Sequence, residues 1–114
     1  MLSQNKEKFS FSICNNKSIT INHANLEKCP RLVVNDKKIK IKSFSLSILV
    51  HSKMHPEGFY RDIAINDNII TATTLSFIKE LLVNDPYVKV IVENIEITKE
   101  GKSDRCKGFI FYVK

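Results

Sequence analysis

The chain has 114 residues, which is enough for one hydrophobic core and too few to expect two, so residues 1–114 are predicted to form a single domain. Its 43% hydrophobic and 26% charged residues are typical of a globular protein and exclude the disordered and fibrous classes. The net charge is +6, from 18 basic and 12 acidic residues, and is compatible with an anionic partner such as nucleic acid.

Alternating apolar and polar residues predict short strands in the first half of the chain, separated by turns rich in Asn, Asp and Ser. These strands cover residues 9–14, 18–22, 31–34, 39–50 and 59–65. Residues 23–26 also fit the start of a helical turn, whereas Cys29 and Pro30 are expected to lie in irregular structure. A polar loop over residues 51–58 separates the last two strands.

The strand over residues 39–50 changes phase in its middle. Ile39 and Ile41 point to one side, but the apolar residues from Phe44 to Val50 occupy positions of the opposite parity. One extra residue in a strand reverses the faces of everything after it, so we predict a β-bulge or sharp bend at Lys42–Ser43.

The residues from Thr71 to Val83 predict one short amphipathic helix. Its apolar residues fall on one side when placed at helical spacing, namely Leu75, Phe77, Ile78, Leu81 and Leu82. A threonine at its start can cap it, and Asn84–Asp85–Pro86 ends it because proline disfavours helical geometry in the preceding residue. A helix this short gains its stability from packing on a neighbouring sheet.

Two further strands end the chain. Residues 88–97 are rich in β-branched residues, as expected of a central strand, and the turn around Gly101 leads to a closing strand over residues 108–113. The predicted fold is therefore mainly β, α+β in the broad sense: a two-layer β-sandwich of six to seven strands with one short helix near Thr71 to Val83.

A series of short motifs in the last third resembles a known family. A polar Asn turn leads into a helix near a Thr, followed by a strand reading V-x-x-E-N-I, a Gly turn, an Arg and a closing I/F-x-F-x-V strand. The residues concerned are Val90, Glu93, Asn94, Ile95, Gly101, Arg105, Ile110, Phe111 and Val113. A weaker match runs back through Ile41, Ser43, Phe44 and Leu46 towards Ser18. In this order they resemble the end of the C-terminal domain of GldM, the gliding-motility and type IX secretion protein of the bacterial cell envelope.

The resemblance implies a non-catalytic protein-interaction or structural module, with no cofactor. GldM family members are anchored in the inner membrane, extend through the periplasm as dimers, and meet an outer-membrane-associated partner through their last domain. It thus implies a periplasmic or cell-envelope location, an envelope protein as partner and a homodimer. No apolar run in this sequence is long enough to span a membrane, and its first residues lack the apolar segment of a signal peptide, so a cytoplasmic location remains the alternative.

The loop over residues 51–60 contains the candidate protein interface. Met54, Phe59 and Tyr60 are large apolar or aromatic side chains within or beside a polar segment. Such side chains dominate the binding energy of protein interfaces when they enter a partner's pocket. We therefore expect them to contact a partner or a second copy of the chain.

The alternative function is nucleic-acid binding. Lys38, Lys40 and Lys42 would share one face of a strand and contact phosphates, although lysines on an exposed strand also prevent aggregation. Phe109 and Phe111 lie in a segment, residues 107–114, that resembles the RNP1 motif of RNA-recognition domains, in which strand aromatics stack on bases. The segment departs from that motif at three positions, and the competing interpretation is that these aromatics belong to the core.

The cysteines and histidines give no clear site. Cys14, Cys29 and Cys106 permit three pairings, and none has the C-x-x-C spacing of a redox or zinc site. Buried thiols or a single disulfide in an oxidising compartment both fit. His51 and His55 have a spacing that binds metal only where other ligands converge, so no metal site is predicted.

No catalytic constellation is recognisable, and the sequence predicts no enzyme. Glu93 and Glu96 are separated by an odd number of residues, which places them on opposite faces of a regular strand. Without a bulge they cannot form a pair of catalytic carboxylates. The chain also lacks a nucleophile elbow or a phosphate-binding loop.

Overall fold

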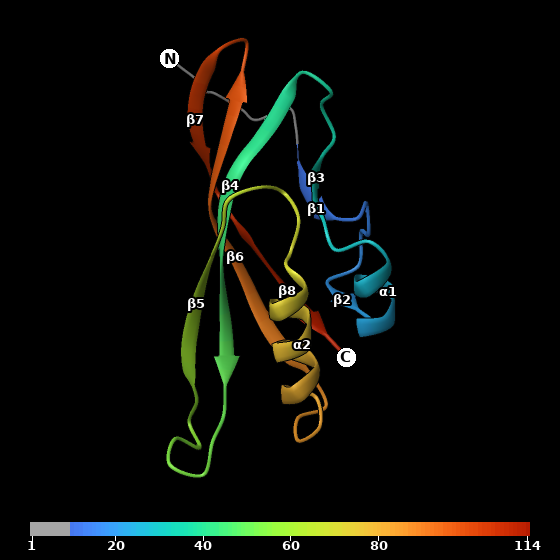
Figure 1. Cartoon of the computed structure of the whole chain (residues 1–114), viewed down its shortest axis with the longest axis vertical. Coiled ribbons are helices and arrows are strands. Elements are labelled where there is room, and N and C mark those ends of the chain that lie inside the picture. Colours follow the sequence, from blue (N-terminus) through green and yellow to red (C-terminus); the bar gives the residue numbers. More distant parts are fainter. Residues whose placement is uncertain (1–9) are drawn as a thin grey trace.

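The computed structural model describes residues 10–114, which form a mainly β fold with two sheets and two helices (Figure 1). The strands are β1 (Phe11–Ile13), β2 (Thr20–Ile21), β3 (Leu32–Val34), β4 (Ile39–Val50), β5 (Phe59–Ile65), β6 (Val88–Lys99), β7 (Lys102–Cys106) and β8 (Phe109–Val113). The helices are α1 (His23–Lys28) and α2 (Ala72–Leu81). The predicted mainly β class is confirmed. The described residues contain one helix more than predicted, and some of their strands are very short. Phe9, in the first predicted strand, lies outside the described residues.

The larger sheet is built around β6. Its strand order is β2-β8-β6-β4-β5, and β7 also pairs with β6. One side of β6 pairs with β4, whereas the other side is divided between β8, opposite residues 88–92, and β7, opposite residues 95–99. All of these pairings are antiparallel, while β2 runs parallel to β8. The second sheet consists of β1 and β3.

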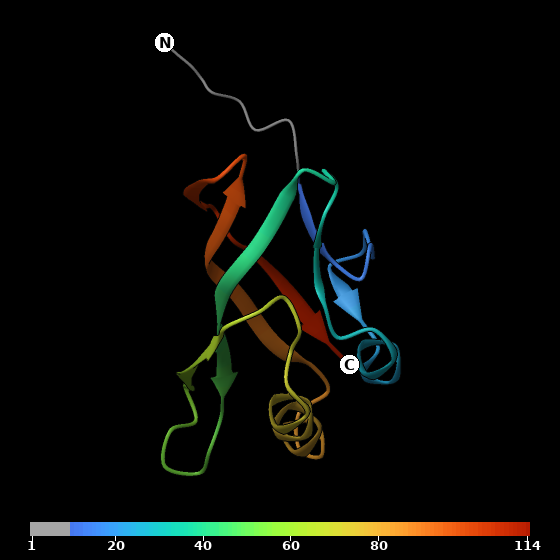
Figure 2. The ribbon, with the colours of Figure 1, turned by 45° about the horizontal axis from the view of Figure 1, so that its top comes forward.

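The core lies on one face of the larger sheet. Figure 2 shows the small sheet and both helices gathered on one side of the long strands. The buried residues of β4 and β6 alternate along each strand and pack with buried residues of the helices and the small sheet. They include Phe44, Leu46, Ile48, Val88, Val90, Val92, Ile95 and Ile97, together with Leu26, Leu32 and Ile78. The intervening residues point to the opposite face, where most stay partly exposed, and we call this the open face.

Two irregularities set which residues reach the open face. The register of β4 against β6 shifts between Ile41 and Ser43, which confirms the bulge predicted at Lys42–Ser43. A second shift follows, because Ser43 pairs with Glu96 and Ser45 pairs with Glu93. The extra residue is in β6, where Asn94 has a φ of 53°. Because paired residues share a face, Glu93 and Glu96 lie on the same face, not on the opposite faces expected of a regular strand.

The helices are held by specific contacts as well as by their apolar faces. The Thr71 hydroxyl accepts a hydrogen bond from the Thr74 amide and caps α2, as predicted from the threonines before it. Leu75 and Ile78 are buried on the side of α2 that packs against the core. His23, the first residue of α1, is buried, and its Nε2 lies 2.9 Å from the Leu75 carbonyl oxygen. Because a carbonyl can only accept, Nε2 carries the proton, and the bond ties α1 to α2.

Two glycines are required by the turns around β7. Gly101 lies in the β6–β7 turn with a φ of 78°, a conformation that glycine adopts without strain, and its missing Cβ faces open space. Gly108 precedes β8 and is packed against β6. A Cβ there would lie 1.6 Å from the Val92 carbonyl oxygen, so a larger residue cannot fit without moving one strand.

A disulfide joins Cys14, after β1, to Cys29, at the end of α1. It selects one of the three pairings that the sequence permitted. Cys106 is buried at the end of β7 and takes no part in this bond. Within residues 10–114 neither helix is long and apolar enough to cross a membrane.

Candidate interaction surface

One end of the molecule is formed by two loops that are distant in sequence. The β4–β5 loop and the loop from α2 to β6 reach the same end, at the bottom of Figure 1. His51 Nδ1 in the first loop lies 3.7 Å from Asp85 Oδ2 in the second. This contact is an ion pair only when the imidazole is protonated. It shows that the two loops meet through their side chains.

Large apolar side chains are exposed at this end. Met54 is 86% exposed, Val83 80% and Tyr87 57%, and Phe59 and Tyr60 are also exposed. We call these five residues the hairpin-end surface. Three of them, Met54, Phe59 and Tyr60, are the predicted interface residues, and all three are exposed; the sequence analysis did not single out Val83 and Tyr87. A weak signal existed for Val83 and Tyr87, because both flank the helix-ending segment 84–86, where the chain must turn at the surface.

The two aromatic residues of β5 face different directions. Phe59 and Tyr60 pair with consecutive residues of β4, Val50 and Leu49, so they lie on opposite faces of the hairpin. Phe59 meets the ring of His55 edge-on, with ring centroids 5.5 Å apart. The exposed aromatic area therefore extends around both sides of the hairpin.

The side chain of Lys89 orients Tyr60 on the open face. Its hydroxyl accepts a hydrogen bond of 3.0 Å from the Lys89 ammonium group of β6. This bond raises the pKa of Lys89, because it stabilises the charged form. The ammonium also lies 5.6 Å from the centroid of the Tyr60 ring, within the range of a cation–π contact. The lysine thus connects the hairpin to the central strand.

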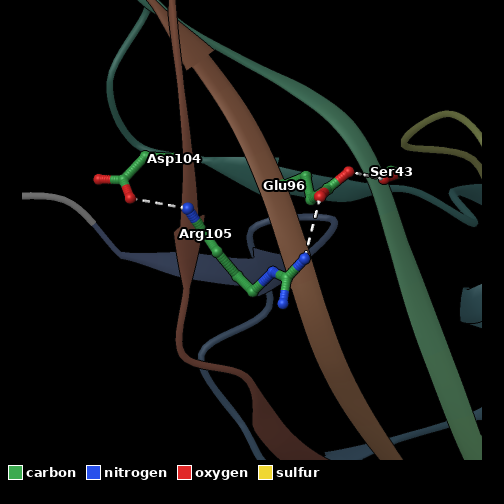
Figure 3. A network of polar contacts seen from close by, with 4 residues as sticks. All are labelled: Ser43, Glu96, Asp104 and Arg105. Carbon is green, nitrogen blue, oxygen red and sulfur yellow. Dashed lines mark hydrogen bonds and ion pairs between the residues drawn. The ribbon is translucent and has the colours of Figure 1, made fainter.

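A polar network crosses three strands farther along the open face (Figure 3). The Glu96 carboxylate of β6 accepts hydrogen bonds from Ser43 Oγ at 3.1 Å and from Arg105 Nη2 at 3.3 Å. The Arg105 guanidinium, and then the Ser43 hydroxyl, hold the pKa of Glu96 below its usual range, because both favour the ionised form. On β7 the Asp104 carboxylate accepts from the Arg105 backbone amide at 2.8 Å. The network links β4, β6 and β7 where the second bulge leaves the ladder irregular.

The acidic residues of this network are not arranged as a pair of catalytic carboxylates. Glu93 and Glu96 share a face, but Glu96 is already paired with an arginine and a serine, which keeps it ionised and unsuited to act as a general acid. Among residues 10–114 no group of three or more His, Cys, Asp or Glu could hold a metal ion. His51 and His55 lie instead near Asp85 and Glu57, at 3.7 and 3.8 Å.

The predicted nucleic-acid contacts are not assembled into one site. Phe111 is 2% exposed and Phe109 packs partly buried against the same core, with ring centroids 6.3 Å apart. The stacking role predicted for these rings is therefore wrong for Phe111, because no ring face is available to a base. Lys38 lies in the turn before β4, so the row of three strand lysines is reduced to Lys40 and Lys42.

Searches with this chain match no protein-family model, no curated protein and no solved structure. The geometry of its surfaces is therefore the main basis for a functional proposal. The hairpin-end surface, which contains the three predicted interface residues Met54, Phe59 and Tyr60, is the candidate that its exposed apolar side chains favour.

Proposed function

We propose that the chain is a non-catalytic protein-interaction or structural module that binds a protein partner through the hairpin-end surface. The observation that carries this proposal is the exposure of Met54, Val83 and Tyr87 at one end of the molecule, beside the exposed rings of Phe59 and Tyr60. Methionine and aromatic residues are enriched in protein interfaces, and large apolar side chains that are exposed at the same end of a molecule are typical of an interaction site.

We further propose that the module works in the bacterial cell envelope or periplasm as a GldM-like domain, with a role in gliding motility or type IX secretion. The order of motifs in the last third of the chain supports this proposal. The Cys14–Cys29 disulfide supports the location, because structural disulfides persist in oxidising compartments such as the periplasm. The expected partner is another envelope protein, and a homodimer through the same surface is the alternative arrangement.

The proposal is tested by photo-crosslinking in the native cell. A photoreactive amino acid is placed at Met54 and, in a matched control, at Ser103, an exposed residue of β7 at the opposite end of the sheet. We expect a crosslinked partner from position 54 that excess unmodified chain competes away, and none from position 103. Equal crosslinking from both positions, or none from either, would contradict the proposal. The mass of the crosslinked product separates a second copy from a different envelope protein.

A further inference from the structure

A second surface shares no residue with the hairpin-end surface. A groove of about 620 Å³ lies between β1 and the outer edge of β8. Its apolar lining includes the buried side chains of Ile13, Ile21 and Phe111. Two large apolar residues also line the groove and remain exposed, Ile19 at 64% and Ile110 at 42%.

The groove runs along a strand edge that is only partly paired. β2 pairs with β8 only at Tyr112 and Val113, and the Tyr112 amide donates to the Ile19 carbonyl at 2.7 Å. Backbone groups alternate in direction along a strand, so the N–H and C=O of Ile110 point to the same outer side as those of Tyr112. Among the described residues no strand pairs with Ile110 on this side. The edge therefore presents one donor and one acceptor to the groove.

The polar lining of the groove has a defined charge. It consists of serine and asparagine side chains and Lys17, which is the one ionisable residue lining the groove in the described part of the chain. A carboxylate would complement this lysine, while a second cation would be repelled. The lining mixes apolar and polar side chains in equal number. Such a lining matches an extended polypeptide, whose side chains can be apolar at alternate positions and whose backbone needs hydrogen-bond partners.

We propose that this groove binds an extended, acidic peptide segment of a partner protein, which adds as a strand to the outer edge of β8 in line with β2. The backbone of the segment pairs with the N–H and C=O of Ile110, and every second side chain enters the groove beside Ile13 and Phe109. A carboxylate of the segment lies near Lys17. In strand addition of this kind the main chain supplies affinity and the alternate side chains supply specificity. The inference goes beyond the proposed function, because it uses a different surface and a different mode of recognition.

The first test uses a defined probe. A fluorescein-labelled peptide of alternating valine and threonine with a terminal aspartate is titrated with the full chain, and binding is followed by fluorescence anisotropy. The control is the same peptide with its amides N-methylated along one edge, which removes the donors and keeps the side chains. We expect saturable binding of the first peptide and binding at least about tenfold weaker for the second. Equal binding of both peptides, or no saturable binding at millimolar concentration, overturns the proposal.

Variants locate the binding site. Ile110→Pro removes the outward amide but leaves the bonds to β6, which come from the neighbouring residues, and proline is tolerated on an edge of this kind. Ile110→Thr keeps the amide and is the matched control. We expect loss of peptide binding in the proline variant only, and a preference of Lys17→Glu for a peptide ending in lysine. Unchanged affinity of the proline variant overturns the proposal.

Two further measurements separate loss of binding from misfolding of a variant, and the groove from the hairpin-end surface. Backbone NMR of the unaltered chain should show a shifted, more slowly exchanging Ile110 amide when the peptide is added, a readout that does not depend on how any variant folds. An Ile110 amide that is unaffected at saturating peptide overturns strand addition. Met54→Asp, which alters the hairpin-end surface, should bind the peptide normally. The two surfaces can thus fail or succeed independently.

Discussion

Removing the disulfide is expected to lower the free energy of unfolding by about 3 kcal/mol. Cys14 and Cys29 are separated by 15 residues, and a cross-link that closes a loop of this length removes about 3 kcal/mol of chain entropy from the unfolded state. The disulfide also connects the small sheet, through the end of β1, to the end of α1. The double variant Cys14→Ser/Cys29→Ser should therefore remain folded and unfold at a lower urea concentration.

The assay is urea unfolding followed by circular dichroism, with and without a reducing agent. Reduced wild type should unfold at the midpoint of the double variant, and the double variant should not respond to the reductant. Cys106→Ser is the matched control, because it removes a thiol that takes no part in the bond and should leave the response to reductant intact. A wild-type midpoint that is insensitive to reductant would refute the reasoning and would also remove the support for an oxidising compartment.

Two further predictions concern the turns and the open face. Gly108→Ala should lower the free energy of unfolding in urea by about 1–3 kcal/mol or more, because the new Cβ would lie 1.6 Å from a backbone oxygen. Gly101→Ala should lower it by about 1 kcal/mol, because only the positive φ is unfavourable there. A larger loss for Gly101→Ala than for Gly108→Ala would contradict the packing at Gly108. Arg105→Ala should raise the pKa of Glu96 towards its usual range, and more than Ser43→Ala does, in an NMR titration of the carboxyl carbon. Since folding lowers the pKa of Glu96, its contribution to stability is present above its unfolded pKa and is lost as pH falls through the folded value. The wild type and Arg105→Ala should therefore converge in stability in acid, and a constant difference would contradict the pairing.

The two bulges show where sequence reasoning works and where it stops. The bulge at Lys42–Ser43 was predictable because serines alternate with apolar residues after it and make the change of parity visible. The bulge at Asn94 was hidden, because β6 has apolar residues of both parities before it, so a change of phase leaves no clear mark in the pattern. The remaining signal is the residue type, since asparagine tolerates positive φ better than most residues.

The candidate surfaces were only partly predictable for a related reason. Met54 stands out as an apolar residue in a polar loop. Val83 is the last residue of the predicted helix and Tyr87 directly precedes the predicted strand over residues 88–97, so the pattern marks neither of them as a surface residue. Their exposure follows from the chain turning between α2 and β6, which the local pattern does not specify. Similarly, the Cys14–Cys29 pairing depends on α1 bringing position 29 back to the end of β1. Spacing alone could not distinguish it from pairings with Cys106.

The geometry favours binding without a large rearrangement at the hairpin end. β4 and β5 pair over seven consecutive positions without a bulge, so the loop that carries Met54 stands on a regular two-stranded support. The contacts from Lys89 to Tyr60 and from His51 to Asp85 restrict the hairpin further at its two sides. A surface that is ordered before binding loses less conformational entropy when a partner docks. If the groove beside β8 is also occupied, the chain can hold two partners at once, because the two surfaces share no residue.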